Sequence, residues 1–375
     1  MKTIGIICEY NPFHNGHLYH INKIKEMYKD STVILILSGN FTQRGDVSII
    51  NKWDKTEIAL NFGIDLVVEL PFSYTLQSSD YFAEGAVTLL NYLKVDYLIF
   101  GSESNDIEKL TTLANTTFDS KYDDIVKKYM DMGLNYPTSL SKAIKELTDL
   151  DINTPNDILG LCYIKQIKKL NSNIIPITIK RTNDYNSNIL EDNIASATSI
   201  RNAINNNIDI KKNVPELTLK YINNISCENY YNLLKYKILS EDDLSIYHNV
   251  DEGINFRIKK YILKSNTLEE LINNIKTKRY TYNKIKRMLM AILCNYTKEE
   301  DKILKNITYI RILGFNTKGK NYLNSIKKEL KIPIITKYIK NNPKLELEKR
   351  VTSIYASIFN NELILKEYMN KPIIK

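Results

Sequence analysis

The chain has 375 residues, and its 52 lysine and arginine residues against 43 aspartate and glutamate residues give a formal net charge of +9. This length suits two domains, or one large domain with an extension. No run of 18 apolar residues occurs, which excludes a membrane-spanning helix, and the first residues lack signal-peptide architecture. The four cysteines are far apart in the sequence, so we expect unpaired thiols and a cytoplasmic protein.

The first 210 residues alternate between short apolar runs and amphipathic segments. The apolar runs are rich in Ile, Val and Leu, and they predict buried parallel strands at 4–8, 32–37, 66–70, 97–100 and 174–179. The segments between them predict helices near 15–29, 51–62, 79–93, 105–117 and 155–170. This order predicts an α/β domain with a Rossmann-like, doubly wound parallel sheet, whose ligands bind at the carboxyl ends of the strands.

Three of the four histidines fall within the seven residues 14–20, directly after the first strand and the turn signal at 11–12. His14 and His17 therefore lie where a strand passes into a helix N-terminus. Free amide groups and the helix dipole at such a place bind anions. Gly16 removes a side chain where a phosphate would contact the backbone. The pattern predicts a phosphate-binding loop.

Two other interpretations of the histidine run stay open. His14, His17 and His20 would suit a metal site if a further ligand with supporting hydrogen bonds were near. Cys8 and Glu9 are close in sequence, but neighbouring side chains on a strand point in opposite directions. The His-x-x-His spacing can also arise by chance.

A second candidate phosphate motif lies at residues 195–201, with the sequence Ala-Ser-Ala-Thr-Ser-Ile-Arg. Ser196 or Thr198 is suited to cap a helix that continues through Ile204. The first amide groups of that helix, with Ser199, are placed to hold phosphates, and the guanidinium of Arg201 matches phosphate geometry. On its own this is a common helix start.

Beyond residue 210 the pattern becomes mostly helical, so we expect a second domain over 211–375. Its helices are predicted near 215–224, 229–237, 267–276, 281–295, 299–306, 319–330 and 344–368. This half has 32 basic and 17 acidic residues, and its densest block, 276–340, has 17 basic and 4 acidic residues. The imbalance favours a polyanionic partner, although a lysine-rich solvated surface would have the same composition.

Several strings of residues carry a resemblance to a known family. The His-x-Gly-His pattern and the helix start ending in Ile200-Arg201 are similar to the two signatures of the adenylyl-transferring, HIGH-type nucleotidyltransferases. Longer strings resemble the bacterial tRNA(Met) cytidine acetate ligases, and they lie at 7–17, 37–45, 65–71, 100–103, 155–160, 179–181, 278–281 and 313–319. Departures are small: Cys8 and Ser199 each stand where alanine is usual.

The resemblance implies the site. His14, His17, Ser199 and Arg201 would be catalytic. The implied ATP-binding residues are Ile7, Cys8, Glu9, Tyr10, Asn11, Pro12, Phe13, His14, Asn15, Gly16, His17, Leu18, Tyr19, His20, Gly101, Asn156 and Arg181. For tRNA we expect Lys278, Arg279, Lys284 and Arg287, with Lys286 on the same segment and Tyr280 and Tyr282 interleaved, since basic and aromatic residues together suit unstacked RNA.

The resemblance also implies the reaction. ATP and acetate would give acetyl-adenylate and pyrophosphate, with Mg²⁺ on the phosphates. The N4 amine of the wobble cytidine, position 34 of elongator tRNA(Met), would then take the acetyl group to give N4-acetylcytidine and AMP. Acetate is already ionised at neutral pH, so the first step needs positioning and charge stabilisation rather than a strong base. Nothing in the sequence indicates a protein partner.

Two alternative functions are weighed against the ligase. A small-molecule adenylyltransferase of the same superfamily would have the same two phosphate motifs, but the basic C-terminal half favours a macromolecular anion. A non-catalytic RNA-binding protein that retained a nucleotide pocket is the other alternative. Intact His14, Gly16, His17 and Arg201 argue against it.

Overall fold

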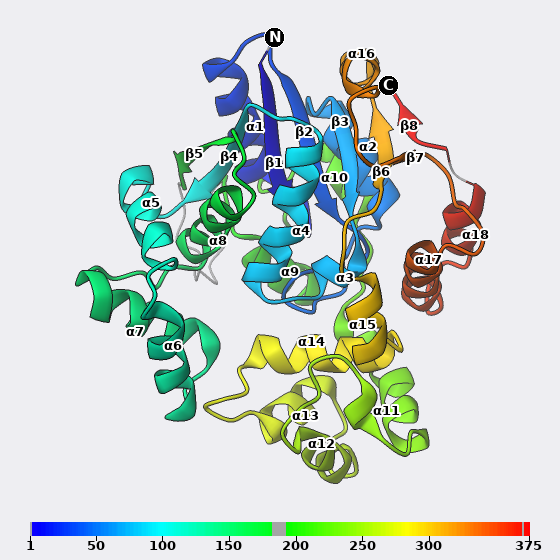
Figure 1. Ribbon diagram of the computed structural model, residues 1–375. Helices are drawn as coiled ribbons and strands as arrows, with labels where there is room; N and C mark the ends of the chain where they lie inside the picture. The colour runs from blue at the N-terminus through cyan, green and yellow to red at the C-terminus, as the bar shows by residue number, and fades with distance from the viewer. Residues whose placement is uncertain (1, 182–192, 370) are drawn as a thin grey trace.

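A computed structural model describes residues 2–181, 193–369 and 371–375. Its centre is a sheet whose strands run in the order β5-β4-β1-β2-β3-β6-β7, with β8 paired to β6 (Figure 1). The five predicted strands are present and parallel to one another, at β1 (Thr3–Cys8), β2 (Thr32–Ser38), β3 (Leu66–Leu70), β4 (Tyr97–Ser102) and β5 (Ile175–Lys180). The chain builds outward from β1 in one direction and then, from β4, in the other. The carboxyl ends of β1 and β4 are therefore the switch point at which such sheets bind ligands.

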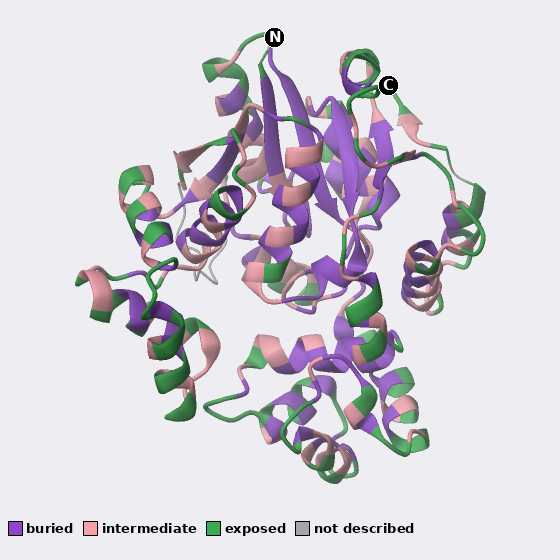
Figure 2. Ribbon diagram, viewed as in Figure 1, coloured by how far each residue is buried: buried purple, intermediate pink, exposed green. Residues whose placement is uncertain are grey.

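The apolar runs form strands because both of their faces are covered. In β2, Val33, Leu35 and Leu37 enter one hydrophobic core, while Ile34 and Ile36 enter the other. Figure 2 shows the central strands almost wholly buried between helices. The alternation is what a strand with a period of two requires when helices pack on both sides.

The five helices predicted in the first half are confirmed, at α1 (Asn15–Met27), α2 (Lys52–Asn61), α4 (Ser79–Tyr92), α5 (Ile107–Thr116) and α8 (Pro155–Lys169). Three more were not predicted, at α3 (Phe72–Thr75), α6 (Tyr122–Asp131) and α7 (Tyr136–Thr148). Helices α6 and α7 pack on each other and project from the sheet on the side of its carboxyl ends (Figure 1).

The second half is mostly helical, as expected. The helix α9 (Ala197–Asn205), expected from the motif at 195–201, closes the first 210 residues. The helices beyond it are α10 (Glu216–Tyr221), α11 (Tyr231–Ser240), α12 (Ile254–Ile262), α13 (Leu268–Ile275), α14 (Tyr282–Leu293), α15 (Lys298–Leu304), α16 (Thr317–Ile326), α17 (Pro343–Ala356) and α18 (Glu362–Met369), with short 3₁₀ turns η1 (Cys227–Tyr230) and η2 (Leu244–Ile246). Helix α12 was not predicted. The single helix expected over 344–368 is wrong: it is divided into α17 and α18, which pack against each other.

The strand β6 (Ile310–Phe315) corrects the expectation that the sheet belongs to residues 1–210 alone. It pairs antiparallel with β3, and it in turn pairs with β7 (Ile334–Ile335) and β8 (Ile373–Ile374). The sheet is thus completed by strands from beyond residue 210. The run Ile-Arg-Ile-Leu-Gly-Phe gives no periodic signal that distinguishes a buried strand from a buried helix.

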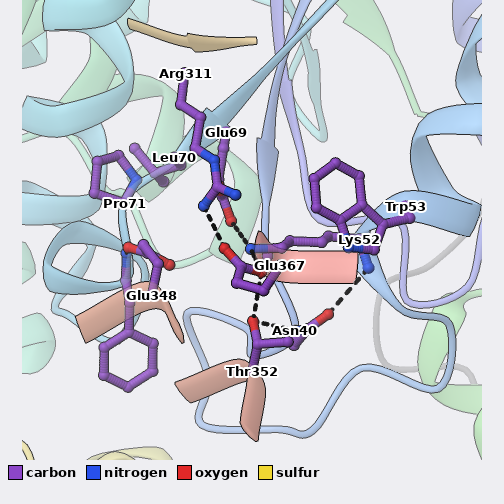
Figure 3. A network of polar contacts seen from close by, with 12 residues as sticks. Asn40, Lys52, Trp53, Glu69, Leu70, Pro71, Arg311, Glu348, Thr352 and Glu367 are labelled. Atoms are coloured by element: carbon purple, nitrogen blue, oxygen red, sulfur yellow. Dashed lines mark hydrogen bonds and ion pairs between the residues drawn. The ribbon is translucent and has the colours of Figure 1, made fainter. Parts of the chain in front are cut away.

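A buried ion network fixes β6 and α18 to the sheet (Figure 3). Lys52 Nζ lies 2.7 Å from both Glu69 Oε1 and Glu367 Oε2. Arg311 Nη1 lies 2.9 Å from Glu69 Oε2 and 2.6 Å from Glu367 Oε1. All four side chains are almost fully excluded from solvent. Each charge therefore has two opposite charges beside it, which is the arrangement that a buried ion pair needs to offset its lost hydration.

Candidate active site

A cavity of about 1050 Å³ opens at the switch point of the sheet. It is bounded by the ends of β1, β4 and β5, the starts of α8 and α9, and the N-terminal end of α14. Most of the residues expected at an ATP site line it, namely Ile7, Cys8, Glu9, Tyr10, Asn11, His14, Gly16, His17, Tyr19, His20, Gly101, Asn156, Arg181 and Arg201.

The other expected residues of the histidine loop, residues 7–20, shape this loop without lining the cavity. Phe13 is buried and stacks on Phe62 with 5.2 Å between ring centroids, and Leu18 packs against the same core. Asn15 donates from Nδ2 to the carbonyl oxygens of Asn193 and Lys212, each at 2.8 Å. These contacts anchor the histidine loop to the segment around α9.

Pro12 is buried and follows a cis peptide bond. Ser199, expected to be catalytic, is also buried. Its Oγ bonds to the carbonyl oxygen of Ser196 at 2.9 Å, and its amide donates to Ser196 Oγ at 3.0 Å. Ser199 thus serves the start of α9, and the cavity is lined by its neighbours Ser196 and Thr198.

His14 and His17 cap helix α1 reciprocally. His14 Nδ1 accepts from the amide of Gly16 at 3.0 Å, and His17 Nδ1 accepts from the amide of His14 at 3.2 Å. The centroids of the two imidazole rings are 3.8 Å apart. A neutral imidazole that accepts at Nδ1 carries its proton on Nε2. Each ring is therefore left with an Nε2–H donor for a ligand.

The charge states of these histidines follow from their surroundings. Burial, with help from the neighbouring guanidiniums of Arg181 and Arg201, lowers the pKa of His14 to about 3. Burial and the nearby His14 and Arg181 hold the pKa of His17 well below its ordinary value, and burial and Arg181 lower that of His20 to about 4. The imidazoles are thus neutral at pH 7, and the positive charge at this end of the cavity comes from the two arginines.

Gly16 and Gly101 are places of close approach. A Cβ on Gly16 would lie 2.8 Å from the His14 ring, so glycine is required for the capping arrangement itself. A Cβ on Gly101 would lie 3.3 Å from Cγ of Arg181, whose amide extends the β4–β5 pairing by donating to Ser102. Both glycines thus keep the histidine and arginine side chains in position.

The two sequence motifs meet although they are about 180 residues apart. Arg201 Nη1 donates to the carbonyl oxygen of Asn11 at 2.7 Å, and its Nη2 lies 3.8 Å from Asp46 Oδ2. The N-terminal turn of α9 and the histidine loop therefore form adjacent walls of one cavity. Asn156 lies at the start of α8 beside them and donates from Nδ2 to Glu103 Oε1 at 2.6 Å.

Three of the four residues proposed for tRNA line the same cavity, a placement that the sequence did not indicate. Arg279, Lys284 and Arg287 line it opposite the histidine loop, whereas Lys278 is exposed and does not. Arg279 pairs with Glu252 at 2.6 Å. Tyr282 is partly exposed.

Two neighbours of these residues are not available to RNA. Tyr280 is buried and donates its hydroxyl to the carbonyl of Asp251, so it is not free to stack on a base. Lys286 is buried and pairs with Asp46.

Sequence reasoning missed the loop at residues 42–47, in which Gln43, Arg44 and Asp46 line the cavity. It also missed Lys55, whose Nζ braces the ends of β1 and β2. The string Gln-Arg-Gly-Asp at 43–46 was the available signal for the loop, since two charged residues flank a glycine just after a strand. The Cys8 thiol, by contrast, is inert because burial raises its pKa to about 12.

The metal interpretation of the histidine run finds no support. Across residues 2–181, 193–369 and 371–375, no group of three or more His, Cys, Asp or Glu side chains is placed to hold a metal ion. The four cysteines are free, as expected. Over the same described ranges no helix combines the length and apolar character that crossing a bilayer requires.

Comparison with known proteins agrees with this geometry. A family model described as HIGH nucleotidyl transferase matches residues 1–370. The tRNA(Met) cytidine acetate ligase of Geobacillus sp. (strain WCH70) is 37% identical to the chain, and the match covers 100% of both proteins. The tRNA(Met) cytidine acetate ligase of Caldicellulosiruptor saccharolyticus is 39% identical, and the match covers 100% of this chain and 98% of that protein. The crystal structure of Thermotoga maritima TmcAL matches with a TM-score of 0.92 at 29% identity, covering 100% of this chain and 99% of that one. The alpha-thio ATP complex of the Thermotoga protein matches with a TM-score of 0.89. The chain therefore belongs to the tRNA(Met) cytidine acetate ligase family of HIGH nucleotidyl transferases.

Proposed function

We propose that the protein is an ATP-dependent acetate ligase that forms acetyl-adenylate and transfers the acetyl group to N4 of the cytidine at position 34 of elongator tRNA(Met). The observation that carries the proposal is the single cavity in which the His14–His17 cap, the start of α9 and the basic end of α14 converge. The cytoplasm, where ATP and tRNA are found, is its expected location.

In the first step a carboxylate oxygen of acetate attacks the α-phosphorus of ATP, and the bond from that phosphorus to the pyrophosphate oxygen breaks. Nε2–H of His14 and His17 donate to phosphate oxygens, while Arg181 and Arg201 add positive charge that favours the developing negative charge on pyrophosphate. Because the imidazoles are neutral, they act as oriented donors rather than as proton sources.

Mg²⁺ fits this site as an ion carried by the triphosphate. Mg²⁺ in phosphoryl-transfer sites keeps several waters and needs only one or two carboxylates besides the phosphates. The carboxylates that line the cavity include Glu9, directly after β1, and Asp46, which lies 3.8 Å from Arg201. What the ion supplies when bound is neutralisation of phosphate charge.

In the second step the N4 amine of cytidine attacks the acetyl carbonyl, AMP leaves with the bonding electrons, and the amine loses a proton. A base inside a stacked strand cannot reach the acetyl-adenylate, so the cytidine must be unstacked and inserted into the cavity. The lining residues of α14 are in position to hold the strand on either side of it.

The test uses purified protein with ATP, labelled acetate and bulk bacterial tRNA, followed by digestion to nucleosides. We expect labelled N4-acetylcytidine, and acetate-dependent exchange between ATP and pyrophosphate without tRNA. An elongator tRNA(Met) transcript with uridine at position 34 is the matched control and should stay unlabelled. A small-molecule adenylyltransferase would instead exchange pyrophosphate only with a phosphorylated small substrate, and a non-catalytic RNA-binding protein would not exchange it at all.

A further inference from the structure

We infer that Arg44 and Arg287 form an oxyanion subsite that receives a backbone phosphate of the RNA strand next to the acetylated cytidine. The inference rests on the proposed function and adds a binding site where the loop at residues 42–47 meets the first turns of α14.

The two arginines are carried by elements that press against each other. Gly45, at φ +77°, lies so close to α14 that a Cβ would be 2.7 Å from the amide nitrogen of Arg287. Lys286 bonds to Asp46 across the same contact, and Arg287 Nη1 is 3.5 Å from the carbonyl oxygen of Gln43. Backbone packing therefore fixes the loop that carries Arg44 against the first turns of α14.

The charges around this pair leave it with excess positive charge. Arg44 acts on the carboxylates of both Glu9 and Asp46, and Asp46 also bonds to Lys286 and lies 3.8 Å from Arg201. The cations Arg44, Arg201, Lys286 and Arg287 thus outnumber these two carboxylates. Arg287 Nε is buried and has no hydrogen-bond partner among the described residues.

His248 also lines the cavity and is a neutral group, because burial lowers its pKa to about 4. Burial and the neighbouring guanidinium of Arg44 lower the pKa of Arg287 to about 10. Two like charges facing one cavity are relieved by an anion placed between them.

The position of the pair favours RNA over the other anions of the reaction. The pair joins two walls of the cavity, because the loop of Arg44 meets the histidine loop through the bond from the Gln43 amide to Glu9, whereas Arg287 belongs to α14. Arg287 shares its wall with Lys284 and Arg279. A cavity of about 1050 Å³ is at the upper end of the roughly 300–1,000 Å³ typical for one small ligand, which leaves room for a nucleotide beside ATP.

The experiment compares Arg44→Gln, Arg287→Gln and the double variant with wild type, and uses Lys302→Ala as the matched control. Lys302 is an exposed lysine of the same basic block and does not line the cavity. Each protein is assayed for acetate-dependent ATP–pyrophosphate exchange, for tRNA binding by gel shift across a salt titration, and for acetyl transfer to tRNA.

We expect each single variant to weaken tRNA binding about tenfold or more and to flatten the salt dependence, because one phosphate contact is lost. Pyrophosphate exchange should fall less than tRNA binding does, and the double variant should lose little more tRNA affinity than the stronger single one, because both arginines hold the same group. Arg287→Lys, which keeps the charge but not the planar fork, should give an intermediate loss and guards against a fold defect in Arg287→Gln.

Other outcomes would overturn the inference. A tenfold rise in the KM for acetate with unchanged tRNA affinity would assign the subsite to acetate, and a rise in the KM for ATP would assign it to the triphosphate. Variants that bind tRNA as Lys302→Ala does would show that the arginines bind no RNA. If wild type fails to exchange pyrophosphate with acetate but the variants still lose tRNA affinity, the proposed function fails and the RNA subsite stands.

Discussion

Lys55 Nζ on α2 lies 2.9 Å from the carbonyl oxygen of Glu9, at the start of the loop that carries the histidines. The same ammonium group donates to the carbonyl oxygens of Ser38 and Gly39, at 2.8 and 2.7 Å, at the end of β2. Its three donors are therefore all used between two neighbouring strand ends, and the side chain is fully buried. These three hydrogen bonds fix the point at which the histidine loop leaves the sheet.

Replacing Lys55 with methionine should destabilise the protein and loosen the ATP loop. Methionine fills a similar volume but leaves three carbonyl oxygens without a donor, and each buried unsatisfied group costs about 1–3 kcal/mol. We expect the free energy of unfolding in urea to fall by at least about 3 kcal/mol and the KM for ATP to rise. A variant as stable as wild type would show that water replaces the brace.

Glu348 should make stability depend on pH. Burial, with the nearby Glu69 carboxylate, raises the pKa of Glu348 to about 8, and its Oε1 accepts the amide of Phe72 at 2.6 Å. An unfolded glutamate has a pKa near 4.3, so between about pH 4.3 and 8 the native state holds a proton that the unfolded state has lost. The contribution of Glu348 to stability is therefore complete below that range and is lost as the pH rises through it.

Glu348→Gln removes this titration while keeping a carbonyl oxygen for Phe72. Relative to wild type, the variant should gain stability between pH 6 and pH 8.5, as measured by urea unfolding at both values. An equal difference between the two proteins at both pH values would mean that Glu348 does not hold the proton.

His17→Ala should impair adenylate formation more than RNA binding. The Nε2–H donor is lost, and removing one such donor typically lowers the rate by about 10²–10³-fold. The measurement is acetate-dependent ATP–pyrophosphate exchange beside a tRNA gel shift. His17→Asn separates two roles, because asparagine retains an acceptor for the amide of His14 and so preserves the helix cap while lacking the donor at Nε2. Full exchange activity in either variant would restrict His17 to a structural role.

Lys284 and Lys278 should differ in their contribution to tRNA binding although they lie six residues apart. Lys284 lines the cavity with its Nζ 4.3 Å from the Tyr280 ring centroid, whereas Lys278 is exposed outside it. Lys284→Ala should weaken tRNA binding and reduce the slope of log affinity against log salt by about 0.7–0.9. Lys278→Ala should do so less, and ATP binding should be almost unchanged in both. Equal losses would indicate a diffuse electrostatic surface.

The sequence was sufficient for the parts of the structure whose signals are local. Each of the five parallel strands is a short apolar run bounded by helices, and each of the two phosphate motifs contains its own helix start. Strand β6 lacked such a signal because what makes it a strand is β3, its partner more than two hundred residues earlier in the chain. The helices α6 and α7 were missed although α7 is as long as α1, because no strand lies between them and their helical neighbours to mark their bounds.

The parts of the site that a sequence motif forms were predictable. The parts that form when distant segments pack against each other were not. The histidine loop and the segment around α9 meet through Arg201 on the carbonyl of Asn11 and through Asn15 on the carbonyls of Asn193 and Lys212, and a matching pair of motifs indicated this meeting in advance. That α14 faces the same cavity depends on Gly45 and on the Lys286–Asp46 pair, and neither is visible as a pattern in the sequence. For Ser199 the motif suggested a contact with a ligand. In the structure its hydroxyl instead donates to the carbonyl oxygen of Ser196 in the first turn of α9.

The pairing of β6 with β3 also constrains how the chain can be synthesised and divided. Translation releases β3 early, yet its outer hydrogen-bonding groups are satisfied only after the ribosome has made residues 310–315. Until then the nascent sheet has an open edge of apolar residues, which is the kind of surface on which chains aggregate. A fragment ending at residue 210 would keep that edge permanently, so we expect it to aggregate more readily than the whole chain.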